Sequence, residues 1–184
     1  KTMQLAAAGA CVVAVALAGL RLKLILETLQ RTALKAETVK ADILDWSPAT
    51  KAQAILLDAP CTATGTIRRH PDILWAKKEE TVAELAALQA RMIDKAADLL
   101  ESGGVLVYAV CSLQPEEGEA QIEAALQRRR DLAREPVDAA EIGGLSEALT
   151  KRGDLRTLPS MLADFGGMDG FFAARLRKKE TPER

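Results

Sequence analysis

Short apolar runs alternate with segments of helical periodicity along this chain, and that alternation is the strongest constraint on its fold. Most of these runs are rich in Val, Ile, Leu and Ala, which is typical of strands buried on both faces. The expected strands are residues 11–17, 37–40, 54–57, 105–110, 155–158 and 171–176. The expected helices are residues 2–8, 20–34, 77–100 and 116–130. Repeated strand–helix units predict an α/β fold whose mainly parallel sheet is covered by helices on both faces.

Glycines mark two expected helix ends, because glycine adopts the left-handed conformation that often follows a helix. Gly9 is expected to end the first helix, and Ser102-Gly103-Gly104 the long helix at residues 77–100.

The last two strands are expected to form an antiparallel pair. Residues 136–150 are expected to be loop and short helix.

The composition describes an ordinary soluble domain. The chain has 184 residues, of which 48% are hydrophobic and 28% charged, so disorder and a disulfide-rich design are excluded. A formal net charge of -1 gives no sign of nucleic-acid binding in the bulk charge. Only 3% of the residues are aromatic, so any surface that stacks on bases must be small.

The cysteines and the histidine limit which metal sites are possible. The 3 cysteines, Cys11, Cys61 and Cys111, are widely spaced and include no Cys-x-x-Cys pair. With His70 as the single histidine, no metal site is expected. A reducing cytoplasmic location is the best match to this cysteine usage. Cys11, inside an expected strand, is expected to lie in the core.

An uncharged stretch at residues 5–20 admits two interpretations. It resembles the core of a signal peptide or a short membrane span, but it is mostly Ala and Gly and shorter than the ~20 residues that a span needs. The favoured interpretation divides it into a helix end, a strand and the start of a second helix. No membrane association is therefore expected.

Three residues follow expected strands and indicate where a ligand would bind. Asp42, Asp58 and Cys111 lie just past strand ends, and ligand sites of open α/β sheets lie outside the carboxyl ends of strands. For any one of them, ordinary turn chemistry or a buried structural cysteine is the alternative. Three such groups at one edge favour a site.

Three segments of the sequence contain the candidate functional residues. The first is DAPCTATGTIRRHPDILW, residues 58–75, a shaped loop with Arg68, Arg69 and His70 as candidate phosphate ligands or simple exposed charges. The second is YAVCSLQPEEGE, residues 108–119, where Cys111 leaves a strand and enters a loop. The third is GGMDGFF, residues 166–172, a glycine turn before an apolar strand.

In this order, the three segments closely resemble signature motifs of the Sun (RsmB/NSUN-type) family of RNA cytosine-5 methyltransferases. The resemblance implies a Rossmann-like class I fold dependent on S-adenosylmethionine (SAM). It makes residues 1–178 a partial methyltransferase catalytic domain, without the family's N-terminal part, and residues 179–184 a charged tail. The substrate it implies is RNA, with ribosomal RNA favoured over transfer RNA.

The resemblance also assigns roles to individual residues. Cys111 matches the family's nucleophile, which adds to carbon 6 of cytosine so that carbon 5 can take the methyl group. Cys61 matches the cysteine that assists resolution of the covalent RNA adduct. Asp58 matches an aspartate placed near both SAM and the base. Arg68, Arg69 and His70 are expected to hold RNA.

Two departures from the family pattern concern the cofactor. Lys1-Thr2 matches the end of the glycine-rich SAM loop, so the chain is expected to be truncated before that loop and its strand. Ala16 stands where an acidic residue normally accepts hydrogen bonds from the SAM ribose. Such bonds contribute roughly 1.5–3 kcal/mol, so their loss predicts about 10- to 150-fold weaker SAM binding. Asp42 matches the next SAM-contacting acid.

Three functions are open at this point. An RNA cytosine-5 methyltransferase is favoured by the motifs at Asp58, Cys61 and Cys111. A catalytically impaired relative that binds RNA or a partner is favoured by Ala16 and the missing loop. A small-molecule or protein methyltransferase on the same fold is the weakest, because that chemistry has no need of the second cysteine.

Overall fold

The computed structural model describes residues 1–76 and 79–180, and the chain divides into two compact units, Lys1–Ala49 and Thr50–Arg184. The expected start of the long helix at residues 77–78 and most of the expected charged tail, residues 181–184, lie outside the described residues.

The first unit is a small parallel sheet with helices. Its elements are α1 (Thr2–Ala7), β1 (Val13–Ala16), α2 (Gly19–Thr32) and β2 (Glu37–Lys40). β1 and β2 are parallel, with Val13 opposite Glu37 and Ala16 opposite Lys40. The stretch at residues 5–20 is thus divided as expected, into the end of α1, the strand β1 and the start of α2.

No helix within residues 1–76 and 79–180 combines the length and the apolar character that crossing a membrane requires.

The expectation that Cys11 lies in the core is wrong. Cys11 is exposed, and it precedes β1, which begins at Val13. Of the four residues of β1, only Ala14 is buried. Two paired strands cover little of each other's surface, so a residue just outside such a pair stays accessible.

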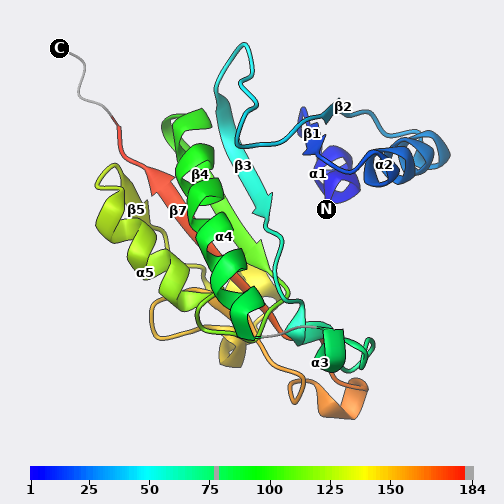
Figure 1. The fold of residues 1–184 in the computed structure, drawn as a ribbon, viewed down its shortest axis with the longest axis vertical. Helices are drawn as coiled ribbons and strands as arrows, with labels where there is room; N and C mark the ends of the chain where they lie inside the picture. Colours follow the sequence, from blue (N-terminus) through cyan, green and yellow to red (C-terminus); the bar gives the residue numbers. More distant parts are fainter. Residues whose placement is uncertain (77–78, 181–184) are drawn as a thin grey trace. The chain divides into compact units, whose positions relative to one another are not determined.

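The second unit is a larger sheet with two long helices. Its strands run in the order β3 (Ala52–Asp58), β4 (Leu100–Val110), β7 (Phe171–Lys178) and β5 (Leu132–Arg134), and β6 (Leu155–Thr157) also pairs with β7. Figure 1 shows α4 (Glu79–Leu99) and α5 (Glu119–Arg128) beside each other across one face of this sheet. The shorter helices are α3 (Ile73–Ala76) and the 3₁₀ turns Thr64–Thr66, Ala139–Ile142, Ser146–Ala148 and Ala163–Phe165.

The expectation of a mainly parallel sheet is wrong for this unit. β3 and β4 are parallel, but β7 runs antiparallel to β4, β5 and β6. Residues 158–170, between β6 and β7, contain only the 3₁₀ turn Ala163–Phe165, whereas a parallel connection usually needs an α-helix as its crossover. The expected antiparallel pair at the end of the chain is therefore confirmed as β6 and β7.

Apolar side chains between the sheet and the helices α4 and α5 form the core of the second unit. Its largest fully buried members are Tyr108, Phe172, Ile93, Leu100, Leu106, Ile122 and Leu176. Burial of one such side chain contributes roughly 1.5–3 kcal/mol relative to exposure. This core fixes the carboxyl ends of β3 and β4, where the candidate site lies.

Two expected boundaries are shifted for local reasons. α4 ends at Leu99, and Ser102-Gly103-Gly104 belongs to β4, at a register shift opposite β3. Gly103 has a φ of 76°, so the glycine serves a bulge in the strand rather than a helix end. α5 begins at Glu119 instead of residue 116, because residues 114–118 form hydrogen-bonded turns.

Candidate active site

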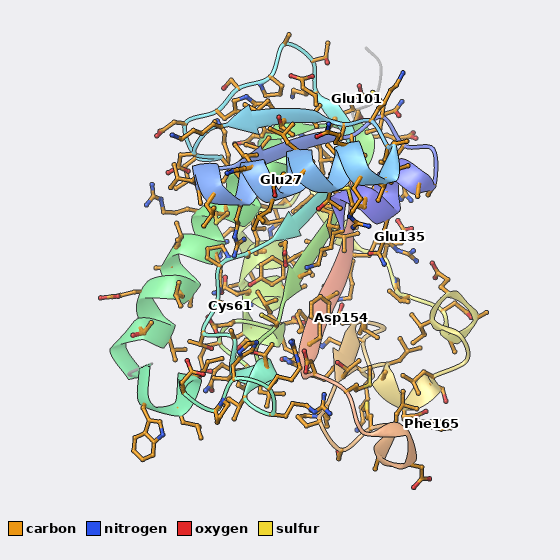
Figure 2. The ribbon with its side chains drawn as sticks, turned by 90° about the vertical axis from the view of Figure 1, so that its right-hand side faces the viewer. Glu27, Cys61, Glu101, Glu135, Asp154 and Phe165 are labelled. Carbon is orange, nitrogen blue, oxygen red and sulfur yellow. The ribbon has the colours of Figure 1, made fainter. Side chains whose placement is uncertain are left out.

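The two parallel strands bring two cysteine loops together. Asp58 is the last residue of β3, and Cys61 lies in the loop that follows (Figure 2). Val110 ends β4, so Cys111 is the first residue of its loop. The Sγ atoms of Cys61 and Cys111 lie 3.6 Å apart, and both residues are half-buried. As the sequence predicts, Asp58 and Cys111 lie at the same edge of the sheet in this unit, because Asp58 of β3 pairs with Ala109 of β4.

Each of the two thiols influences the ionisation of the other. The pKa of Cys61 is raised by its hydrogen bond to Cys111, by burial and by negative charge on Cys111. Two interacting thiols titrate as a pair, and a charge on one opposes ionisation of the other. Either sulfur could donate the S–H hydrogen bond between them, and ionisation of Cys111 would leave Cys61 as the donor.

Gly65 joins the cysteine loops to the glycine turn at residues 166–170. Its N–H donates to the carbonyl oxygen of Cys111 at 3.0 Å, and its own carbonyl accepts from the N–H of Gly170 at 2.8 Å. A Cβ atom at Gly65 would lie 1.9 Å from the Gly170 oxygen. The three motifs therefore meet at a point where only glycine fits.

Gly65→Ala is expected to destabilise the second unit by about 1–3 kcal/mol, because the clash is with backbone rather than with a flexible side chain. Urea unfolding followed by circular dichroism measures the loss. Gly19→Ala is the matched control, since its Cβ would meet nothing nearer than the Lys40 side chain at 3.9 Å. Equal midpoints for the two variants would contradict this assignment of tight packing.

Arg68 and Arg69 are held by the third motif. Arg69 Nε donates to both oxygens of Asp169, at 3.0 and 2.9 Å, and its Nη2 adds a third contact. Arg68 Nη1 lies 3.6 Å from Asp169 Oδ1, and its Nη2 donates to the Gly166 carbonyl. The hydrogen bonds from Arg69 lower the pKa of Asp169, so the pair stays charged at neutral pH. Both guanidinium groups remain partly exposed, as does His70.

The expected cofactor residues lie at or near strand and helix ends in the two units. In the first unit, Ala16 ends β1, and Asp42 follows β2 and accepts from the N–H of Leu44 at 2.9 Å through Oδ1. Lys1 caps α1. In the second unit, Asp58 is exposed at the end of β3. The turn chemistry weighed for Asp42 is thus present and occupies one of its oxygens.

Within residues 1–76 and 79–180, no group of three or more His, Cys, Asp or Glu side chains could hold a metal ion.

Comparison with known proteins decides the family. The family model described as 16S rRNA methyltransferase RsmB/F matches residues 1–177. The chain belongs to the RsmB/F methyltransferase family. The resemblance drawn from the three motifs is thereby confirmed, together with the Rossmann-like α/β fold.

Named relatives of this RsmB/F chain are rRNA methyltransferases. The ribosomal RNA small subunit methyltransferase B of Salmonella arizonae is 44% identical over 86% of this chain and 34% of its own length. The protein of that name from Pseudomonas syringae pv. tomato is 44% identical over 94% of this chain and 38% of its own. The chain thus spans about a third of the length of these curated relatives.

Solved structures agree with this RsmB/F assignment. The crystal structure of NSun6 from Pyrococcus horikoshii with SFG matches with a TM-score of 0.73 and 27% identity, over 93% of this chain and 42% of that one.

Sequence reasoning missed the polar groups that support the two cysteines in this RsmB/F chain. Glu117 and Ser112 are fully buried beside the cysteine loops, and Arg156 of β6 donates to the Ser112 carbonyl at 2.6 Å. Glu117 was expected to start a helix, because an acidic residue near a helix start is common. The local pattern gave no signal for its burial, because Thr62, one of its partners, lies 55 positions away in the chain.

Proposed function

We propose that this chain carries the catalytic cysteines of a SAM-dependent RNA cytosine-5 methyltransferase. The observation that supports the proposal is the pair of thiols, Cys61 and Cys111, 3.6 Å apart at the carboxyl ends of β3 and β4 in an RsmB/F chain. The names of the relatives favour ribosomal RNA over transfer RNA as the substrate.

Cys111 is the proposed nucleophile. Carbon 5 of cytosine is a weak nucleophile, so the ring must first be activated. The Cys111 thiolate forms a bond to carbon 6, and the electrons of the 5,6 double bond make carbon 5 electron-rich. SAM, when bound, supplies the methyl group that carbon 5 takes.

Cys61 is proposed to assist release of the product. After methylation, the proton on carbon 5 leaves to solvent, its electron pair restores the double bond, and the carbon–sulfur bond breaks. Cys111 then leaves as a thiolate, and the S–H of Cys61 stabilises that charge through a hydrogen bond. The raised pKa of Cys61 keeps this proton available.

Asp58 and the cations are proposed to bind the substrate. Asp58, exposed at the end of β3, would hydrogen bond to the polar edge of the cytosine ring. Arg68, Arg69 and His70 are exposed on the loop after Cys61 and would contact phosphates. Because Asp169 already holds both arginines, an RNA phosphate would share them rather than find them free.

The residues of this chain fit SAM only in part. Lys1 and Asp42, both in the first unit, are the groups proposed to hold it. Ala16 presents a methyl group where the family has an acceptor for the ribose hydroxyls, and Asp42 has one oxygen committed to the Leu44 N–H.

Methylation of RNA by the complete protein tests this function. We expect 5-methylcytosine in a 16S rRNA transcript incubated with the protein and SAM, measured by mass spectrometry of nucleosides, and less in transfer RNA. A methyl group on any other position, or on neither RNA, would overturn the proposal.

A second function, a catalytically impaired relative that binds RNA, is favoured by Ala16 at the end of β1. Titration of the complete protein with SAM by calorimetry separates the two. Absence of SAM binding together with retained RNA binding would support the impaired relative.

Ala16→Asp is expected to strengthen SAM binding by about 10- to 150-fold, because it restores hydrogen bonds worth roughly 1.5–3 kcal/mol to the ribose hydroxyls. Calorimetry measures the change. Ala16→Asn is the control for charge and should recover less. An unchanged affinity in Ala16→Asp would show that this strand end does not contact the ribose.

A further inference from the structure

Glu117 is a buried carboxylate whose partners are all neutral. It is fully buried, and in the described part of the chain no Lys, Arg or His side chain forms an ion pair with it. Instead, four donor groups converge on its two oxygens, from Thr62, Ser112 and Gln89. A buried charge without a counter-ion is costly, so its retention calls for a purpose other than stability.

The donors belong to the residues next to the two cysteines. The backbone N–H of Thr62, the residue after Cys61, donates to Glu117 Oε1 at 2.9 Å, and the Thr62 hydroxyl donates to Oε2 at 2.5 Å. The hydroxyl of Ser112, the residue after Cys111, donates to Oε2 at 2.5 Å. One carboxylate oxygen therefore links the loop after β3 to the loop after β4.

Further contacts hold the carboxylate and the loops in one position. Gln89 of α4 donates to Glu117 Oε1 at 3.0 Å and to the Pro60 carbonyl at 2.8 Å, on the other side of Cys61. The Tyr108 hydroxyl of β4 donates to the Glu117 carbonyl at 2.7 Å. The backbone around Cys61 is thus fixed from both sides.

We propose that Glu117 is a positioning residue that sets the spacing of the two cysteine sulfurs. It touches neither sulfur directly and acts through Thr62 and Ser112. This inference deepens the proposed function and rests on it, because a hydrogen bond between Cys61 and the departing Cys111 thiolate requires that spacing. A misplacement of about 1 Å at reacting groups can lower a rate on the order of 100-fold.

Glu117→Gln, with Glu116→Gln as matched control, tests the proposal in the complete protein. Glutamine keeps the size of Glu117 but replaces one accepting oxygen with an NH₂ group. That group cannot accept hydrogen bonds from the surrounding donors. We expect kcat to fall about 100-fold, with KM for RNA and the Kd for SAM unchanged. Glu116 is exposed and should behave as wild type.

Disulfide formation measures the spacing without any methyl transfer. Diamide takes one hydrogen from each thiol, so Cys61 and Cys111 become a disulfide and diamide becomes the hydrazine. Mass spectrometry of peptides follows the reaction in a Cys11→Ser background, which removes the exposed third thiol. We expect Glu117→Gln to form this bond more slowly than wild type or Glu116→Gln.

The two measurements separate this inference from the function it rests on. If the wild-type protein does not methylate RNA, the proposed function fails, while the disulfide rates still report the spacing. If Glu117→Gln does not fold, the variants Thr62→Val and Ser112→Ala are used instead. Each of them removes one hydroxyl donor to Glu117. A wild-type disulfide rate in all folded variants, or a loss carried only by KM, would overturn the role of Glu117.

Discussion

Cys111→Ala in the complete protein is expected to abolish cytosine methylation, with a loss of roughly 10⁴-fold or more, the scale of removing a covalent nucleophile. Alanine has no group that can add to carbon 6. Tritium transfer from labelled SAM to RNA measures the rate. Binding of RNA and SAM should be nearly unchanged.

Cys11→Ala is the matched control for Cys111→Ala. Cys11 is exposed in the first unit and belongs to none of the three motifs, so its removal should leave turnover as in wild type. Substantial activity in Cys111→Ala would show that Cys61, or no thiol, attacks the base, and the assignment of the nucleophile would have to be withdrawn.

Apolar patterning predicted most of the fold of this chain, because strands such as β3 and β4 contain the apolar runs at residues 54–57 and 105–110. It missed β5, which has only the three residues Leu132–Arg134 and exists by pairing with β7. It also took Gly103 as a helix end, since a left-handed glycine serves a helix end and a strand bulge equally well. The direction of β7 depended on which strands it meets, which local pattern does not encode.

The sequence predicted which motifs form the site, but not which side chains contact one another within it. Strand ends placed Asp58 and Cys111 at one edge, because neighbouring parallel strands share their carboxyl ends. The hydrogen bonds between Arg69 and Asp169 join residues that are 100 positions apart in the chain. The hydrogen bond from Thr62 to Glu117 joins residues that are 55 positions apart. Such pairs follow from the closed fold, so a sequence shows the charges but not their partners.

Cys61→Ala is expected to accumulate a covalent protein–RNA adduct through Cys111. The addition to carbon 6 needs only the Cys111 sulfur, so the adduct still forms. Its breakdown slows, because the departing thiolate loses the S–H donor that lies 3.6 Å away. A denaturing gel with labelled RNA, run after reaction with SAM, should show a band retarded by the mass of the protein.

The double variant Cys61→Ala/Cys111→Ala separates this explanation from nonspecific crosslinking, since it lacks the attacking sulfur and should give no retarded band. Cys61→Ser adds a finer test, because its hydroxyl can still donate to the departing thiolate and should shorten the life of the adduct relative to alanine. A clean gel for Cys61→Ala with normal turnover would mean that Cys111 leaves without help. The closeness of the two sulfurs would then serve packing rather than release, and the raised pKa of Cys61 would have no part in the reaction.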